Sequence, residues 1–366
     1  MSYKNLEIEL ESLLSQVVEE GASDLHLIPG HPPILRIDSE LHPLTDKTAL
    51  TADQVQSMAQ VMLEQNRYQT LLERRDLDFS FAFREQTRFR VNAYFEKGVL
   101  SLALRHVPAV IKTFEELRLP PQIKNFADHK QGLVLVAGPT GHGKSTTLAA
   151  LIDYINQNRT EHIVTIEDPI EYIFAQKKSV IQQREVGFDT PSFAQAIRAT
   201  LREDMNVVMV GEMRDPESMA ATITVAETGH LVFATLHTND AAQTIDRIID
   251  NFPPSQQQQI RAQLAAILVG IISIRLVRKI GGGRIPAVET LVTNDAVRNL
   301  IRENKTYELI NVVHTGAKDG MISMDQSLAA LVSQNLISLE EAKLYVHYPD
   351  IFESKLRTPS FGLTNN

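Results

Sequence analysis

One nine-residue segment constrains the fold of this 366-residue chain more than any other feature of its sequence. It follows a continuous apolar run, Leu133 to Ala137, and leads into a helical pattern from Ser145 to Asn156. Its glycines allow successive backbone N–H groups to converge on phosphate at the positive end of that helix. The spacing G-x-x-x-x-G-K-S indicates a phosphate-binding P-loop rather than a chance glycine-rich turn. The loop consists of Gly138, Pro139, Thr140, Gly141, His142, Gly143, Lys144, Ser145 and Thr146.

Two side chains of this loop have expected roles. In a P-loop the Lys144 ammonium reaches the β- and γ-phosphates, and the Ser145 hydroxyl holds Mg²⁺. The motif therefore predicts a nucleotide bound together with Mg²⁺.

Acidic side chains are expected beside the loop, because two further strand patterns end in acids. The apolar run 207–210 leads into Glu212, and a strand next to the P-loop strand would bring that carboxylate to the Mg²⁺ water shell or to an attacking water. The segment 165–171 adds Glu167 and Glu171. Because several carboxylates near phosphate repel it unless a metal or a water is present, Glu167 is a further candidate for Mg²⁺ contact.

A histidine follows a third strand pattern. His237 ends the run 231–238 and could contact the γ-phosphate by a hydrogen bond. A lone histidine is more often structural, so the pattern alone leaves both readings open.

The composition limits the other classes of protein. A chain of 366 residues is expected to form two or three domains. Its net charge of −9 argues against a broad nucleic-acid-binding surface. The absence of cysteine excludes disulfides and cysteine-ligated zinc and fits a cytoplasmic location. The longest apolar run, Leu264 to Ile272, is far shorter than the roughly 20 residues of a membrane-spanning helix, so no such segment is expected.

The first hundred residues have the pattern of a small α+β domain. Alternation places Phe79, Phe81 and Phe83 on one face of a strand, and it places Arg88 and Arg90 on the face of the next strand away from its apolar residues. The expected elements are a helix over 6–17, strands at 24–28 and 34–38, a helix at 52–73 capped by Thr51, and strands at 79–83, 89–93 and 99–105.

Strand and helix patterns then alternate, which is typical of a parallel sheet with helical crossovers. We predict domains at 1–106 and 127–345, a linker at 107–126 and a tail at 346–366. The expected strands are 133–137, 163–167, 206–211, 231–238 and 287–292, and the expected helices are 145–156, 191–203, 216–227 and 256 to about 278.

Four segments together resemble the signature boxes of secretion and pilus motor ATPases, and more specifically of type IV pilus retraction ATPases. They are the P-loop, the acidic segment 165–171, the segment Gly211-Glu212-Met213-Arg214-Asp215 and the segment Thr235-Leu236-His237-Thr238. The resemblance runs from about residue 20 to residue 326. Further matching segments are 21–27, 88–92, 184–187 and 226–230.

This resemblance implies an α/β fold in which a smaller PAS-like α+β domain precedes a RecA-like P-loop ATPase domain. It implies an Mg²⁺-dependent ATP hydrolase that forms a homo-hexamer, peripheral at the cytoplasmic face of the inner membrane at the pilus base. The output would be pilus retraction and twitching motility. The implied partners are an inner-membrane pilus platform protein and, as a further candidate, an accessory retraction ATPase. Nucleic acid is not an expected partner, because the net charge is −9.

The resemblance also implies roles for individual residues. Glu212 would be the Walker B glutamate, Glu171 the glutamate of the acidic box and His237 the residue of the histidine box; with Lys144, these are the expected catalytic residues. Arginines of the N-terminal domain would complete the nucleotide site, and these correspond to Arg88, Arg90 and Arg105.

A segment near the C-terminus is similar to an element of retraction ATPases, in which isoleucine usually stands at the position of Val297. Asp295 is a candidate cap for this helix, and the pattern alone is also that of an ordinary amphipathic helix. The segment consists of Ala296, Val297, Arg298, Asn299, Leu300, Ile301, Arg302 and Glu303.

Two departures from the family pattern stand out. His142 occupies a loop position where the family usually has serine, and Met205-Asn206 replaces the usual Pro-Asp before the strand that leads to Glu212. Neither change affects Lys144 or Glu212, so catalytic competence is still expected.

Several alternative functions are compatible with a P-loop in this sequence. Within the superfamily these are an accessory retraction ATPase and a pilus-assembly or type II secretion ATPase, although the absence of cysteine argues against the branch with a four-cysteine metal site. Outside it they are a nucleic-acid translocase, a small-molecule kinase and a scaffold that binds ATP without useful turnover.

Overall fold

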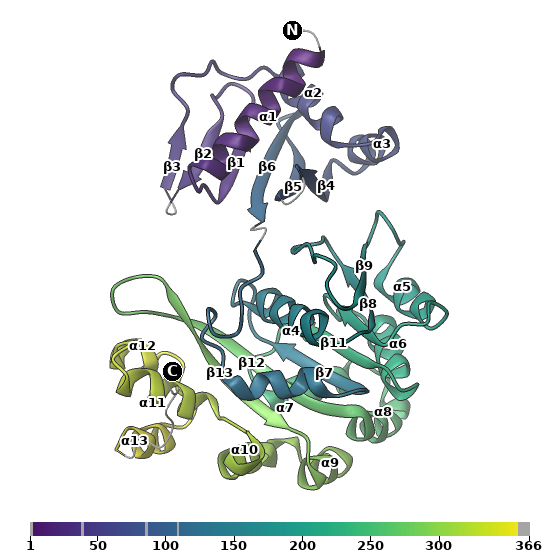
Figure 1. Cartoon of the computed structure of the whole chain (residues 1–366), viewed down its shortest axis with the longest axis vertical. Coiled ribbons are helices and arrows are strands. Elements are labelled where there is room, and N and C mark those ends of the chain that lie inside the picture. Colours follow the sequence, from purple (N-terminus) through teal and green to yellow (C-terminus); the bar gives the residue numbers. More distant parts are fainter. Residues whose placement is uncertain (1–2, 38–39, 85–86, 108–109, 358–366) are drawn as a thin grey trace. The chain divides into compact units, whose positions relative to one another are not determined.

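The computed structural model describes residues 3–37, 40–84, 87–107 and 110–357. The chain divides into two compact units, one of Met1–Val110 with Asp168–Ile173 and the other of Ile111–Glu167 with Phe174–Asn366. Figure 1 shows the elements of both units. Asp38, predicted as the end of a strand, and residues 358–366 of the expected tail lie outside the described residues.

The first unit contains an antiparallel six-stranded sheet in the order β3-β2-β1-β6-β5-β4. Its helices supply apolar side chains to the same core as the sheet. The elements are α1 (Tyr3–Glu19), β1 (Asp24–Leu27), β2 (Ile34–Ile37), β3 (Glu40–Pro43), α2 (Ala52–Met62), α3 (Gln65–Arg74), β4 (Asp76–Phe83), β5 (Thr87–Glu96) and β6 (Val99–Val107).

The single helix predicted at 52–73 is wrong, because the chain forms two helices there. Thr51 caps α2 as predicted, and it exchanges hydrogen bonds with Gln54 in a capping box. The helix then ends at Leu63, whose backbone is extended (φ −115°, ψ 133°) and whose side chain is buried in the core. Glu64 is also extended, and α3 begins after it.

The predicted alternation in β5 is confirmed. Phe89, Val91 and Ala93 are buried, whereas Arg88 and Arg90 are half-buried on the opposite face. A polar face therefore runs along this strand.

The second unit contains a seven-stranded sheet in the order β13-β12-β7-β11-β10-β8-β9. Neighbouring strands are parallel except for β13, which pairs antiparallel with β12. The carboxyl ends of β7, β11, β10 and β8 consequently share one edge of the sheet. The strands are β7 (Gly132–Ala137), β8 (His162–Glu167), β9 (Val180–Glu185), β10 (Val207–Val210), β11 (Leu231–Leu236), β12 (Leu268–Arg278) and β13 (Arg284–Val292).

The helices predicted at 145–156 and 216–227 are confirmed as α4 and α6. The helix predicted at 191–203 forms as the shorter α5. The helices of this unit are α4 (Lys144–Asn158), α5 (Phe193–Thr200), α6 (Pro216–Glu227), α7 (Ala241–Asp250), α8 (Pro254–Ile267), α9 (Asp295–Arg302), α10 (Leu309–Thr315), α11 (Met324–Ser333), α12 (Leu339–Lys343) and α13 (Pro349–Arg357), with 3₁₀ turns at Pro121–Asp128, Thr306–Glu308 and Gly316–Asp319. Among the described residues, no helix combines the length and the apolar character needed to cross a bilayer.

The helix predicted from 256 to about 278 is wrong beyond Ile267. The chain changes there from α8 to β12, which inserts between β7 and β13 and is buried over most of its length. Gly270 permits this close packing, because a Cβ at that position would lie 2.3 Å from Cε1 of Phe126 and 2.5 Å from the Leu291 carbonyl oxygen.

The C-terminal helices pack beside the β12–β13 hairpin. Figure 1 shows α11, α12 and α13 gathered next to it, and Phe352 of α13 shares a buried core with Val277 and Ile285 of the hairpin. The tail expected from residue 346 therefore includes a packed helix. The cap of α9 is Asn294, whose Oδ1 accepts a hydrogen bond from the Val297 N–H, and not Asp295 as predicted.

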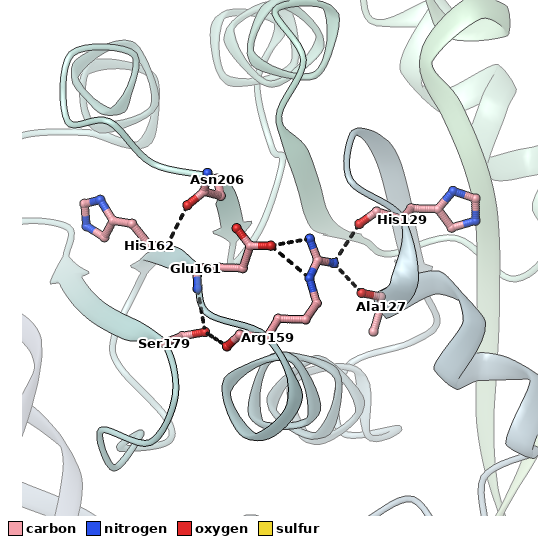
Figure 2. Close-up of polar contacts among 7 residues, drawn as sticks. All are labelled: Ala127, His129, Arg159, Glu161, His162, Ser179 and Asn206. Carbon is pink, nitrogen blue, oxygen red and sulfur yellow. Dashed lines mark hydrogen bonds and ion pairs between the residues drawn. The ribbon is translucent and has the colours of Figure 1, made fainter.

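Polar contacts tie together the edge of the sheet opposite the P-loop, where β8 and β10 begin (Figure 2). The Arg159 guanidinium binds both the Glu161 carboxylate and the carbonyl oxygens of Ala127 and His129. Oδ1 of Asn206 accepts a hydrogen bond from the His162 N–H at 2.8 Å. Residue 206 thus helps to align the starts of β8 and β10 at this edge.

Candidate nucleotide-binding site

The P-loop lies between β7 and α4, as its motif predicts. Gly138 has φ of +151°, and a Cβ there would lie 2.4 Å from the Ile274 carbonyl oxygen of β12, so only glycine fits. Gly143 occupies the N-cap of α4 in the left-handed conformation, and Lys144 is the first residue of the helix. The loop therefore wraps the positive end of α4, which is the arrangement that binds phosphate.

Lys144 is held over this loop and is only 8% exposed. Its ammonium donates hydrogen bonds to the carbonyl oxygens of Gly138 at 2.8 Å and Pro139 at 3.0 Å. A buried cation above a cradle of backbone N–H groups fits a nucleotide phosphate chain. Ser145 lies in the first turn of α4. Its predicted role as a ligand of Mg²⁺ stays a prediction.

Glu212 and His237 meet beside Lys144. Oε1 of Glu212 lies 3.0 Å from Nε2 of His237, and Nδ1 of the same imidazole lies 3.4 Å from Nζ of Lys144 and 3.3 Å from Oγ1 of Thr140. A neutral imidazole protonated on Nε2 satisfies these contacts, because it donates to the carboxylate and accepts from the ammonium. The ends of three neighbouring strands, β7, β11 and β10, are thereby connected through side chains.

Arg214 forms an ion pair with Glu212, and the sequence analysis did not predict this contact. Its Nε lies 2.9 Å from Oε2 of Glu212, so both carboxylate oxygens are held. The only signal in the sequence was that Arg214 lies two residues after the acid. Glu212 is 19% exposed, which leaves it accessible to a water molecule.

Glu167 lies at the end of β8 and is buried. Its Oε1 accepts hydrogen bonds from Oγ1 of Thr165 at 2.7 Å and Nε2 of Gln183 at 3.1 Å. Its place at the same edge of the sheet is compatible with the predicted Mg²⁺ role, which stays a prediction.

The β12–β13 hairpin also contacts the P-loop. The Leu276 N–H donates a hydrogen bond to Nδ1 of His142 at 3.0 Å, and Nη1 of Arg284 lies 3.4 Å from the Gly141 carbonyl oxygen. Burial and the positive charges of Arg275, Arg284 and Lys144 lower the pKa of His142. The imidazole is thereby favoured in its neutral form.

The three predicted arginines gather on one face of the first unit. Arg90 of β5 pairs directly with Arg105 of β6, and Arg88 is two residues from Arg90 on the same face. Within this unit Arg88 contacts Ser80, Arg90 contacts Asp78, and Arg105 binds Asp24 at 2.8 Å. Glu171 belongs to the segment grouped with this unit. Participation of these four residues in the nucleotide site stays a prediction.

The predicted retraction element is α9 with Glu303 following it. Val297 and Ile301 are buried, and Leu300 packs against the same core. Nη1 of Arg298 donates hydrogen bonds to the carbonyl oxygens of Ala265 at 2.7 Å and Ala266 at 2.8 Å, at the end of α8. This arginine therefore satisfies carbonyl groups that the helix cannot bond internally.

The P-loop on a parallel strand, with a histidine and an acid at the ends of the next two strands, defines a P-loop nucleotide-binding protein. The chain belongs to the family described as type II/IV secretion system protein, whose model matches residues 2–282. Its fold is similar to a crystal structure of the pilus retraction motor PilT with bound ADP, with a TM-score of 0.88 and 48% identity over 94% of this chain and 98% of that one.

Curated relatives extend this similarity over most of the chain. The type IV pilus retraction ATPase PilT of Pseudomonas aeruginosa is 42% identical over 94% of this chain and all of its own length. A twitching motility protein of Neisseria gonorrhoeae is 44% identical over 85% of this chain and 83% of its own. The type IV pilus ATPase PilU of P. aeruginosa is 39% identical over 92% of this chain and 88% of its own.

Proposed function

We propose that this protein hydrolyses ATP to drive type IV pilus retraction and, through it, twitching motility. The observation that carries the chemistry is the contact chain from Lys144 through His237 to Glu212 beside the P-loop. Similarity to PilT over most of the chain supports retraction as the output.

Different residues of the second unit carry out different parts of ATP hydrolysis. Water attacks the γ-phosphate in line with the bond to ADP, that bond breaks, and ADP and phosphate are the products. Glu212, held by Arg214 and His237, orients the water or accepts its proton. Lys144 and the loop N–H groups neutralise the charge on the phosphates. Ser145, with Glu212 acting through water and Glu167 as a further candidate, would hold the Mg²⁺ that supplies further charge neutralisation.

Other residues are proposed to complete the site and link it to movement. Arg88, Arg90 and Arg105 would contact the phosphate chain, and Glu171 would assist Glu212. Because such groups lie outside the P-loop unit, hydrolysis can couple to movement between units. We propose a homo-hexamer at the cytoplasmic face of the inner membrane, working on a pilus platform protein.

The accessory retraction role is the second candidate, and the similarity to PilU is the observation in its favour. An accessory ATPase would require a partner motor, whereas a principal motor supports retraction without one. The same cellular test separates these two roles.

The test is complementation of twitching in a host that lacks its own retraction ATPases, with ATP hydrolysis measured on the purified variants. Wild type is expected to restore twitching, and Lys144→Ala is expected to lose both twitching and hydrolysis. Arg298→Ala is expected to lose twitching but to hydrolyse ATP within about threefold of wild type, because Arg298 contacts the end of α8 and not the P-loop. Exposed Lys318→Ala is the matched control and should behave as wild type.

Three results would count against the proposal. Twitching restored by Lys144→Ala contradicts an ATP-driven motor. Loss of hydrolysis in Arg298→Ala contradicts the separation of α9 from the chemistry. If wild type restores twitching only when a second retraction ATPase is supplied, the accessory role is favoured.

A further inference from the structure

His142 is the side chain through which the P-loop contacts β12, and its position in the sheet explains why. Pairing between β7 and β12 ends at Ala137 and Ser273, where the chain of β7 turns into the loop. The N–H of Leu276 lies beyond that point on β12 and donates to Nδ1 of His142 at 3.0 Å. The imidazole thus extends the connection between loop and sheet past the last paired residues.

From this contact we propose that His142 is a positioning residue that holds the P-loop in its phosphate-binding conformation. The inference rests on the proposed nucleotide-binding function and assigns this side chain a part in it. Three glycines give the loop many alternative backbone conformations, whose loss on binding phosphate costs conformational entropy. An anchor to β12 restricts those conformations before the nucleotide arrives, so it raises the fraction of protein that is competent to bind.

The anchor depends on the protonation state of the imidazole. Nδ1 can accept a hydrogen bond from a backbone N–H only when it carries no proton, and both ring nitrogens are donors in the charged form. The charged groups that act on His142 are Arg275 of β12, Arg284 of β13 and Lys144 of α4, all positive. They add to burial in lowering its pKa below 6.5.

The direction of the pH effect follows from that lowered pKa. Well above pH 6.5 the imidazole is neutral in both the anchored and the released loop, and the anchor is intact. As the pH falls below 6.5, the released loop binds a proton more readily than the anchored one. The anchored conformation is therefore lost progressively as the pH falls through the lowered pKa, and nucleotide affinity falls with it.

Asparagine provides a matched variant at this position. Its Oδ1 is attached to Cγ as Nδ1 is in histidine, so it can accept the same hydrogen bond, but it does not titrate. Alanine removes the acceptor altogether. Comparison of His142→Asn with His142→Ala therefore separates the hydrogen bond from other effects of substitution, and comparison of His142→Asn with wild type isolates protonation of His142 from that of other groups.

The experiment is equilibrium titration of the full chain with ADP from pH 7.5 down to pH 5, with ATP hydrolysis measured at pH 7.5. At pH 7.5 we expect His142→Ala to bind ADP about fivefold more weakly than wild type, the size of one net hydrogen bond. His142→Asn should recover most of that affinity. The alanine variant should show a raised KM for ATP with a smaller change in kcat. As the pH falls, wild type should lose affinity relative to His142→Asn.

Equal ADP affinity of wild type and His142→Ala at pH 7.5 would overturn the inference. A constant ratio of wild-type to His142→Asn affinity across the pH series would also overturn it. Failure of wild type to bind ADP at any pH is a different outcome, because it would contradict the proposed function itself.

Discussion

At the scale of single residues, the orientation of Glu212 depends on two neighbouring side chains, the imidazole of His237 and the guanidinium of Arg214. His237 contacts one carboxylate oxygen and also Lys144, whereas Arg214 contacts only the other oxygen by its Nε. Removal of Arg214 consequently leaves the connection to the P-loop intact while it releases one side of the acid.

We predict that Arg214→Ala lowers kcat for ATP hydrolysis about tenfold and changes KM little. The reason is that a positioned acid or base contributes about 10²- to 10⁴-fold to rate, and a variant with a poorly oriented acid loses part of that contribution. Steady-state kinetics measure both constants. Arg198→Ala is the control, because that side chain is 53% exposed and its nearest acid lies at 3.9 Å. Unchanged kcat in Arg214→Ala would show that Arg214 does not orient Glu212.

Glu289 is a buried acid with a consequence for stability. It is 3% exposed and accepts hydrogen bonds from the Ala241 N–H at 2.9 Å and from Ser273. Burial, with a further contribution from Asp240, raises the pKa of Glu289 to about 7 from 4.5. The folded protein therefore binds this proton more tightly than the unfolded chain, and the stability that it contributes is lost as the pH rises through 7.

We predict that Glu289→Gln removes this pH dependence. The amide imitates the protonated acid, so the variant should match wild type near pH 5 and exceed its melting temperature by a few degrees at pH 8.5, since one pKa unit is about 1.4 kcal/mol. Thermal unfolding at the two pH values measures the difference. Exposed Glu227→Gln should follow wild type throughout. Parallel curves for wild type and Glu289→Gln would contradict the raised pKa.

The candidate site residues that the sequence predicts are those that belong to a local sequence pattern. Lys144 lies in a motif of defined spacing, and Glu212 and His237 follow strands whose ends a parallel sheet brings together. Arg214 and Glu289 were missed because their contacts depend on how strands and helix ends align in three dimensions, which no local spacing encodes.

At the scale of elements, Arg159 holds the 3₁₀ turn before β7 and the start of β8 to the end of α4 (Figure 2). We predict that Arg159→Ala lowers the free energy of unfolding by about 2–3 kcal/mol, because it leaves two carbonyl oxygens and a half-buried carboxylate without their donor. Denaturant unfolding measures this change. Arg357→Ala, at an exposed ion pair of α13, should change it by less than about 0.5 kcal/mol. A loss below 1 kcal/mol in Arg159→Ala would contradict this role.

The strand β12 shows where element prediction from sequence failed. The four glutamines at 256–259 do belong to a helix, α8, and the apolar residues after them continue without an obvious break. A strand buried on both faces lacks the polar alternation that would distinguish it from a buried helix. The signal available was the group of three β-branched residues that follows Gly270, namely Ile271, Ile272 and Ile274.

At the scale of the whole molecule, the proposal that arginines of the first unit complete a nucleotide site of a neighbouring subunit leads to a mixing experiment. Lys144→Ala and Arg90→Ala should each be inactive in ATP hydrolysis. Mixed oligomers should recover measurable activity, because some sites would combine an intact P-loop with an intact arginine. Hydrolysis by the mixture, relative to each variant alone, is the measurement, and no recovery in demonstrably mixed oligomers would contradict a shared site.

Two or three domains were expected from chain length, and a domain boundary was expected at the change of pattern after residue 106. The grouping of Asp168–Ile173 with the first unit was not, because these residues directly follow β8 of the second. A chain segment can join a compact unit far from it in sequence, and only tertiary contacts reveal it.

Hydrolysis of ATP through Glu212 is tested most directly by one comparison. Steady-state ATP hydrolysis is compared between wild type and Glu212→Gln, with ADP affinity measured on the same samples. We predict that the variant binds ADP within about threefold of wild type but hydrolyses ATP at least about 100-fold more slowly. Hydrolysis by Glu212→Gln at the wild-type rate would contradict it.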